Sequence, residues 1–418
     1  MRANYLAAME VQPLFYIIIG ILTFEFLLER SLSYLNYTWY SKPVPSEVDD
    51  VYDTAEYERS QEYKKTNFRF GMISATVSFV ATMLFLFMDG FAILDSWARS
   101  IADHDILVAI VFFGIIAAAG EIISLPFSYF GTFVIEERFG FNKTTKKIFV
   151  IDKLKGWLLT ALLGGGLLAV IILCYQWTGT NFWLYVWILV FAVSLLMNMF
   201  YARLFVPLFN KQVPLQEGDL KHKISDYAAT VGFQLDKIFV IDGSKRSTKA
   251  NAYFSGFGSE KRVTLYDTLI DKLSQEEIVA VLAHEVGHYK KKHIIYNLIA
   301  STVTTGFTLW LFSLFVDSDL LAQALGVQTA SFHIGLVAFG LLYAPISRIT
   351  GLIMSSLSRK FEYQADHYAQ DTYKAEPLIN ALKKLSSSSL SNLTPHPAYV
   401  FFHYSHPSLQ QRIVAMKA

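Results

Sequence analysis

Seven stretches of the chain are long and apolar enough to cross a lipid bilayer as helices. A membrane-spanning helix needs about 20 consecutive, mostly apolar residues, and the polar positions of this sequence gather between such stretches. The predicted spans cover residues 14–28, 70–88, 106–127, 157–177, 182–205, 294–316 and 332–357. The pattern predicts a mainly α-helical, multi-pass membrane protein with seven transmembrane helices.

The connections between these spans differ in positive charge. Lys and Arg number six in residues 30–69, six in 128–156, thirteen in 206–293 and seven in 358–418, whereas the other connections have almost none. Connections rich in Lys and Arg stay in the cytoplasm. We therefore predict an N-terminus outside and cytoplasmic segments at 206–293 and 358–418. The first span lacks a small-residue cleavage pattern, so we expect it to be retained.

Composition narrows the chemistry further. The chain has 418 residues, of which 53% are hydrophobic and 17% charged, and its formal net charge is +1. Because no excess of positive charge is available to neutralise phosphates, we expect no nucleic-acid partner. Cys174 is the one cysteine and lies in an apolar stretch. Any metal site must therefore use His and carboxylate ligands.

Outside the spans the pattern predicts a small mixed segment. Residues 215–231 are typical of a polar helix, and residues 237–241, 251–257 and 262–266 are typical of strands. A turn over residues 258–260 is expected to join the last two strands. Residues 377–387 and 407–416 are predicted to be further helices.

The most specific motif is H-E-V-G-H at residues 284–288, within a predicted helix over residues 275–293. Histidines four residues apart share one helical face, so both imidazoles reach one metal ion with Glu285 beside them. Ser274 and Glu277 form a capping box at the start of this helix. A motif of this form arises by chance in roughly one chain of such composition per hundred. The alternative is a pair of packed or hydrogen-bonded histidines on an ordinary helix.

A catalytic zinc needs a third protein ligand and an open position for water. From His288 to the end of the sixth span is 28 residues, and from the start of the seventh span to Glu362 is 30, or roughly 42 and 45 Å of helix. An antiparallel hairpin of these spans therefore brings Glu362 level with His288. Asp366, one turn later, is placed to orient a ligand histidine. A solvated acidic helix end is the alternative, but the length match favours one zinc ion held by His284, His288 and Glu362.

Zinc with such ligands supports peptide bond hydrolysis, in which Glu285 takes the proton of the attacking water and passes it to the leaving amine. The oxyanion intermediate needs a further donor. The donors available near the C-terminus are His403, His406 and Arg412, although a hydrogen-bonded surface role is more frequent for each. A predicted strand either aligns an extended substrate along its edge or is an ordinary strand; its residues are Asn251, Ala252, Tyr253 and Phe254.

These motifs together resemble the type I CaaX prenyl protease family, integral-membrane zinc metalloproteases with a gluzincin-like metal site. The motifs are E-E-R-F-G-F-N-K at 136–143, N-A-Y-F-S-G at 251–256, the H-E-V-G-H helix, residues 362–366, and S-H-P-S at 405–408 with Arg412. The resemblance implies that His284, His288 and Glu362 bind zinc, that Glu285 is the base, and that a set of three residues lines the substrate cleft. That set is Asn251, His406 and Arg412.

The resemblance also implies a barrel-like chamber of seven tilted helices, with the metal site at its cytoplasmic end and the small sheet beside it. The expected substrates are C-terminally prenylated proteins that lose their last three residues. We expect four parts: residues 1–205 with spans one to five, 206–293 as a cytoplasmic metalloprotease segment, 294–357 with spans six and seven, and 358–418 with the third zinc ligand.

Two other functions fit part of this pattern. A membrane quality-control metalloprotease of the heat-shock type has the same chemistry but usually fewer spans. A transporter that binds a permeating cation would need inverted repeats and helices broken at mid-membrane, which the pattern lacks. The short tail after Arg412 lacks the extension of many eukaryotic relatives, which favours a prokaryotic cytoplasmic membrane over the endoplasmic reticulum.

Overall fold

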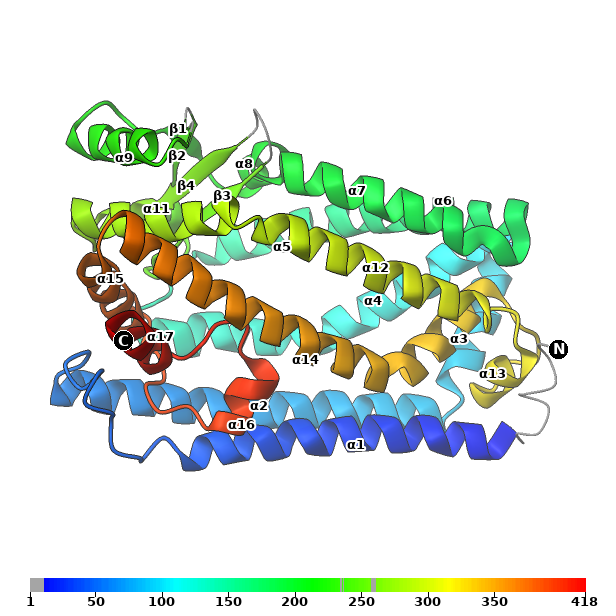
Figure 1. Ribbon diagram of the computed structural model, residues 1–418. Helices are drawn as coiled ribbons and strands as arrows, with labels where there is room; N and C mark the ends of the chain where they lie inside the picture. The colour runs from blue at the N-terminus through cyan, green and yellow to red at the C-terminus, as the bar shows by residue number, and fades with distance from the viewer. Residues whose placement is uncertain (1–10, 234, 236, 257–260) are drawn as a thin grey trace.

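The computed structural model describes residues 11–233, 235, 237–256 and 261–418, which form long helices running side by side with a small sheet at one end (Figure 1). The α-helices are α1 (Val11–Thr38), α2 (Thr54–Phe87), α3 (Gly90–Ile101), α4 (Asp105–Phe130), α5 (Lys146–Leu159), α6 (Gly165–Thr178), α7 (Phe182–Leu204), α8 (Val206–Phe209), α9 (Asp219–Thr230), α10 (Asp267–Ile270), α11 (Gln275–Lys290), α12 (His293–Ser313), α13 (Asp319–Ala324), α14 (Phe332–Thr372), α15 (Ala375–Ser388), α16 (Pro397–His403) and α17 (Leu409–Lys417). The other elements are the π-helical η1 (Gly131–Glu136) and η2 (Thr160–Gly164), the 3-10 turns η3 (Gly179–Asn181) and η4 (Gly243–Lys245), and the strands β1 (Gln212–Pro214), β2 (Ile238–Ile241), β3 (Ala252–Ser255) and β4 (Arg262–Tyr266).

Helices long and apolar enough to cross a membrane number six among the described residues, so the predicted count of seven is one too many. The predicted fourth and fifth spans are counted together in Lys146–Phe209, because only the three residues of η3 separate α6 from α7. The chain turns there at Gly179, whose φ is 54°, and α6 packs against α7. Each of the other predicted spans falls in a long helix of its own. The predicted class, a mainly α-helical multi-pass membrane protein, is confirmed.

The spans expose most of their apolar surface. Only 6–17% of the residues in their most apolar windows are buried inside the protein, and Ile122 and Trp177 are 73% and 82% exposed. Exposed apolar area of this extent is unfavourable in water and ordinary in lipid. These helices are therefore suited to the hydrocarbon interior of a lipid bilayer.

The sheet has the strand order β1-β2-β4-β3. β2 and β4 are parallel, and the other two pairs are antiparallel. Three strands were expected here, and β1 is an addition. It forms because the chain after α8 runs back along β2, and it delays the predicted 215–231 helix to Asp219, since the Leu215 N–H still donates to the Ile238 carbonyl. Phe257 and the expected turn at 258–260 lie outside the described residues.

Residues from two distant parts of the sequence share the core at this end of the molecule. α11 packs against α9, α14 and α15, and buried side chains from both parts are in contact, among them Leu265, Ile278, Leu282, Leu378 and Ile413. The predicted segments 206–293 and 358–418 therefore pack as one unit, although two spans separate them in the sequence.

The helix of the H-E-V-G-H motif ends earlier than predicted. α11 stops at Lys290, Lys292 adopts a left-handed conformation with φ of 60°, and α12 begins at His293. The expectation of one helix to His293 is therefore wrong. A residue with positive φ cannot continue a right-handed helix, so the chain changes direction before it enters the sixth predicted span.

Candidate metal centre

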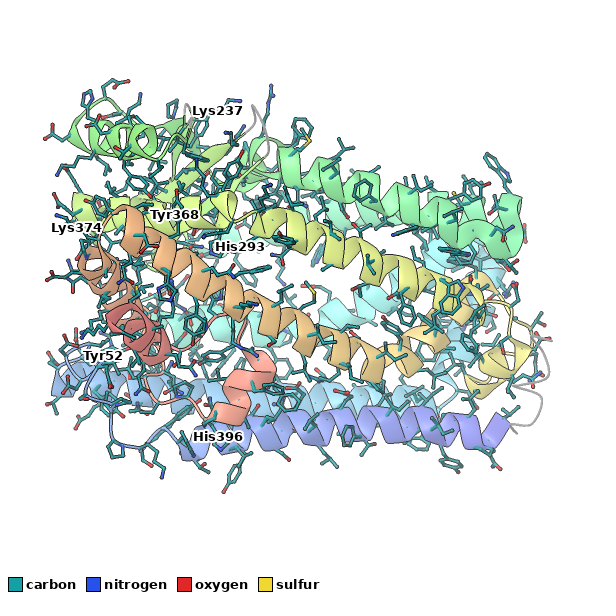
Figure 2. The ribbon with its side chains drawn as sticks, viewed as in Figure 1. Tyr52, Lys237, His293, Tyr368, Lys374 and His396 are labelled. Carbon is teal, nitrogen blue, oxygen red and sulfur yellow. The ribbon has the colours of Figure 1, made fainter. Side chains whose placement is uncertain are left out.

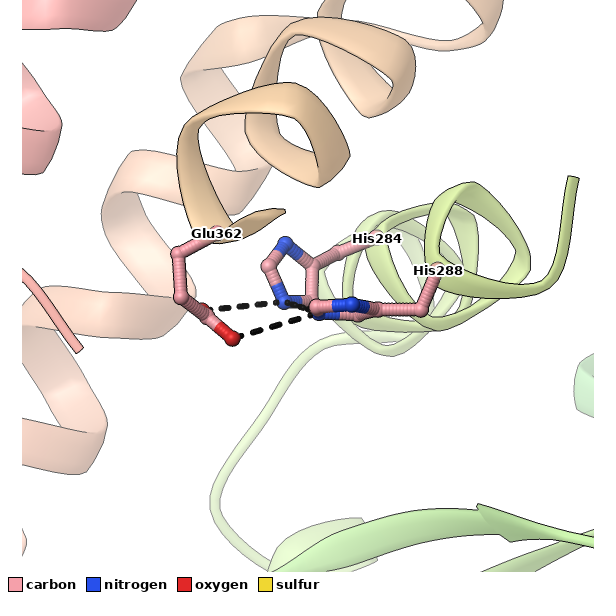
Figure 3. Close-up of side chains that lie close together, drawn as sticks. All are labelled: His284, His288 and Glu362. Carbon is pink, nitrogen blue, oxygen red and sulfur yellow. Dashed lines mark hydrogen bonds and ion pairs between the residues drawn. The ribbon is translucent and has the colours of Figure 1, made fainter. Parts of the chain in front are cut away.

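His284 and His288 on α11 face Glu362 on α14 (Figure 3). The Nε2 atoms of the two histidines are 3.1 Å apart. His284 Nε2 lies 3.5 Å from Glu362 Oε2, and His288 Nε2 lies 3.3 Å from Glu362 Oε1. The ligand atoms of all three side chains lie within 4.8 Å of one another, as a shared metal ion requires.

The close approach of α11 and α14 depends on Gly287. A Cβ at this position would stand 3.1 Å from the Ala365 backbone and from Tyr368 Cβ. At the other end of α11, Ser274 and Glu277 form the predicted capping box. The start of α11 is thus fixed by its own capping residues. The distance between α11 and α14 is short because Gly287 has no side chain.

The three side chains fit a zinc ion. Zn–N bonds of about 2.0–2.1 Å in a tetrahedron separate two ligand atoms by about 3.3 Å, close to the three distances above. Glu362 is 4% exposed, and its Oε2 atom is buried without a hydrogen-bond partner among the described residues. A buried carboxylate oxygen without a donor is unfavourable, and a cation beside it removes that cost.

Asp366 and Arg412 lie behind His284. The Nδ1 atom of His284 is 2.9 Å from Asp366 Oδ1, and Arg412 donates to both Asp366 oxygens, from Nε at 2.8 Å and from Nη2 at 2.6 Å. Burial alone lowers the pKa of His284, but its bonds to Asp366 and Glu362 raise it to about 9. Asp366 and Glu362 therefore favour a positive charge at His284 or beside it, as a bound cation supplies.

Arg412 holds the carboxylate instead of opening to solvent. Its side chain is 11% exposed. Burial lowers the pKa of Arg412, yet the bonds to Asp366 outweigh burial and raise that pKa above the ordinary value. Arg412 also reaches the ligand group, because its Nη1 atom lies 3.6 Å from Glu362 Oε2. Its predicted place in the substrate cleft stays a prediction.

His288 has a different support, which the sequence pattern did not reveal. Its Nδ1 atom lies 3.0 Å from His293 Nδ1, and His293 Nε2 lies 2.8 Å from Gln364 Oε1. Because an amide oxygen only accepts, His293 donates from Nε2 and accepts at Nδ1 from His288. This relay leaves the lone pair of neutral His288 on Nε2, toward Glu362. His293 lies beside α14 (Figure 2), and its ring stacks on Phe361 with centroids 4.1 Å apart.

In a straight helix His293 would lie about 140° around the axis from His288. The break at Lys292 brings the two rings together. The signal in the sequence, a histidine five residues after the motif, has no helical spacing that would single it out.

Glu285 and His406 are the predicted catalytic residues nearest the open side of the group. Glu285 is half-buried beside the histidines, and its charge acts on Arg412. His406 Nε2 lies 3.2 Å from Glu362 Oε1, and its side chain is 58% exposed. Burial of part of the ring lowers the pKa of His406. His403 instead lies 3.5 Å from Glu29 and does not join the group.

The predicted substrate strand is at the edge of the sheet. β3, which contains Ala252, Tyr253 and Phe254, pairs only with β4 among the described strands. Asn251 precedes it and is exposed, and the Phe254 ring lies 5.6 Å from Tyr289, the neighbour of His288. An edge strand this close to the histidines has unpaired backbone groups for an extended peptide.

Two known families match the chain, one after the other. The family described as "CAAX prenyl protease N-terminal, five membrane helices" matches residues 33–211, and "Peptidase family M48" matches residues 214–418. The chain is 34% identical to CAAX prenyl protease 1 of Saccharomyces cerevisiae over 92% of this chain and 91% of that protein.

Plant relatives and a solved structure agree with these matches. The CAAX prenyl protease 1 homolog of Arabidopsis thaliana is 36% identical, with 97% of each chain covered. The crystal structure of S. mikatae Ste24p superimposes with a TM-score of 0.92 at 33% identity, covering 97% of this chain and 99% of that chain. Similarity of this extent along nearly the whole sequence shows that the chain belongs to the CAAX prenyl protease 1 family of M48 metallopeptidases.

Proposed function

We propose that this protein is a zinc metalloprotease that removes the C-terminal tripeptide of prenylated CaaX proteins at the cytoplasmic face of a membrane. The observation that carries the chemistry is the orphaned Glu362 oxygen facing two imidazole nitrogens in a family of metallopeptidases. The substrate class comes from the relatives, which are named CAAX prenyl proteases.

The residues around the metal site have separate roles in peptide hydrolysis. Zinc held by His284, His288 and Glu362 would polarise the scissile carbonyl and lower the pKa of a bound water. Glu285 takes the proton from the attacking water and delivers it to the leaving amine. His406, open to the cleft, donates to the oxyanion.

The remaining residues keep the ligands in place. Asp366 accepts the proton of His284 Nδ1 and so directs the lone pair of Nε2 toward the ion, and Arg412 fixes Asp366. The edge of β3 offers backbone groups along which a peptide aligns. These roles follow from contacts that each side chain makes in the fold.

We infer which cellular membrane holds the protein from the organisms of its relatives. The plants and the yeast named above are eukaryotes, which favours the endoplasmic reticulum over the prokaryotic membrane that the short C-terminal tail favoured. We place the metal site and residues 206–293 in the cytoplasm because of the Lys and Arg distribution.

The test is hydrolysis of a farnesylated CaaX peptide and of its unprenylated twin by the purified protein. We expect release of the C-terminal tripeptide, faster from the farnesylated peptide. Glu285→Gln should retain zinc by elemental analysis and lose activity by about 10²–10⁴-fold, the usual contribution of a general base. Equal rates on both peptides would contradict the prenyl specificity, and an active Glu285→Gln variant would contradict the assignment of the base.

A further inference from the structure

We propose that a cationic pocket lined by Arg30 of α1 and Lys64 of α2 binds the C-terminal carboxylate of the substrate. The pocket has a volume of about 420 Å³, and its other walls come from α16 and from the segments beside it, including Asn392 and Tyr404. This inference rests on the proposed function, because it names how the same enzyme would recognise the end of its substrate.

The pocket holds hydrogen-bond donors that lack acceptors. Arg30 makes only two long contacts, from Nη1 to the Gly71 carbonyl at 3.4 Å and to the Met72 sulfur at 3.8 Å. Its Nε atom and the Nδ2 atom of Asn392 are buried without a hydrogen-bond partner in the described chain. Asn392 uses its oxygen to accept from the Thr394 N–H, so its amide nitrogen is left to donate.

The positive charge of the pocket is not balanced. No carboxylate among the described residues lies within ion-pairing distance of Arg30 or Lys64, and no acidic residue lines the pocket. The acidic residues nearest in sequence pair elsewhere, Glu29 with Arg348 and Glu62 with Arg138. Burial and the positive charge of Lys249 both act against the charged form of Lys64, and an anion bound beside Lys64 relieves that cost.

One wall of the pocket adjoins the segment that carries His406. The carbonyl of Tyr404 accepts from Arg359 at 2.7 Å, and Arg359 lies about one helical turn before Glu362 on α14. Two residues after Tyr404, His406 lies 3.2 Å from Glu362. Because two residues span at most about 7 Å of backbone, the Tyr404 wall of the pocket adjoins the segment that brings His406 to the ligand group.

The pocket also reaches the segment before β3. Tyr63, which lines the pocket, accepts from Lys249 at 3.2 Å, and Lys249 stands two residues before Asn251. Lys249 is paired with Glu136 at 2.8 Å, so it is not itself available to bind a substrate carboxylate. The pocket therefore lies between the His406 side and the β3 side of the predicted cleft.

The place of the pocket suits the end of a substrate chain. One wall adjoins the segment of His406, and another adjoins the segment before β3. A lipid phosphate would suit the two cations as well, but it would not explain contacts with both sides of the cleft. We therefore assign the substrate terminus and treat an anionic lipid as the competing outcome.

The experiment compares two farnesylated peptides that differ only in a C-terminal free acid or amide, using the full-length protein. We expect the wild type to show a kcat/KM at least about ten-fold higher for the acid, as for a hydrogen bond to a charged group. Arg30→Met and Lys64→Met should each remove most of this preference by lowering kcat/KM for the acid. Lys65→Met, an exposed neighbour on α2, is the matched control and should keep the preference.

The metal content and the melting temperature of each variant show whether a substitution has altered only the pocket or has unfolded the protein. Equal wild-type rates on the acid and the amide would overturn the inference while leaving the proposed function intact. Hydrolysis of neither peptide would overturn both. If phosphatidylserine vesicles instead raised the melting temperature of the wild type but not of Arg30→Met, with no acid preference, the pocket would belong to a lipid.

Discussion

His284 and His288 have unlike supports, although they occupy equivalent places in the motif. His284 rests on the charged pair of Asp366 and Arg412, whereas His288 rests on His293, a neutral acceptor. A carboxylate partner makes an imidazole more basic than a neutral partner does. We therefore expect His284 to be the stronger donor to the metal, and His288 to depend on the orientation that His293 imposes.

Removal of the Glu362 carboxylate should empty the metal site. In Glu362→Ala, the two imidazoles remain beside Arg412 without the compensating negative charge, so we expect less than one-tenth of the wild-type zinc content by elemental analysis. The helix should persist because alanine favours it. Unchanged zinc content would remove Glu362 from the ligand set.

Replacement of His293 tests the second support. His293→Phe retains a ring that can stack on Phe361 but has no acceptor for His288. Loss of such a partner typically costs 10–100-fold in metal affinity, measured by competition with a chelator. His367→Phe, at an exposed histidine of α14, is the control and should leave the affinity unchanged. A normal affinity in His293→Phe would show that the relay does not orient His288.

At the scale of elements, the site depends on how closely α11 and α14 pack. The ligands come from both helices, so a shift of a few tenths of an ångström between the helix axes changes the separation of Glu362 from both histidines. Gly287 permits the contact, with backbone atoms of Ala365 only 3.1 Å from where a Cβ would be. Backbone yields less readily than a flexible side chain.

Gly287→Ala should therefore impair the metal site more than the fold. We expect a loss of about 1–3 kcal/mol in stability from overpacking and a larger proportional loss in zinc affinity and peptide hydrolysis. Gly351→Ala on α14, where nothing lies within 4 Å of the new Cβ, is the control and should match the wild type. Full activity in Gly287→Ala would mean that the ligand geometry tolerates a wider helix separation.

At the scale of the whole molecule, the two ends differ in what they contain. The sheet, α9, α11, α15 and α17 gather at one end, and α3 and α13 lie at the other (Figure 1). The positively charged connections of the sequence belong to the first end, which holds the metal ligands. The orientation predicted from those charges stays a prediction.

Cysteine labelling tests this orientation, because Cys174 is the one cysteine in the sequence. In a Cys174→Ser background, Lys143→Cys should be protected and Thr180→Cys labelled by a membrane-impermeant maleimide added from outside intact membranes. Both positions are exposed, and permeabilised membranes should label both. The opposite pattern would invert the predicted topology.

The sequence by itself determined the features that depend on local spacing: the apolar stretches, the capping box at Ser274, the shared face of His284 and His288, and the return of Glu362 through two spans of matched length. Helical periodicity and rise per residue are properties of short range, so they can be read along the chain.

Only the tertiary structure decided the features that depend on contacts between distant segments. The left-handed Lys292 turns His293 onto His288, Arg412 pairs with Asp366, and β1 joins the sheet after α8. In each case the energy of packing and of charge pairing across the fold outweighs local preference, and no pattern within the segment records that energy.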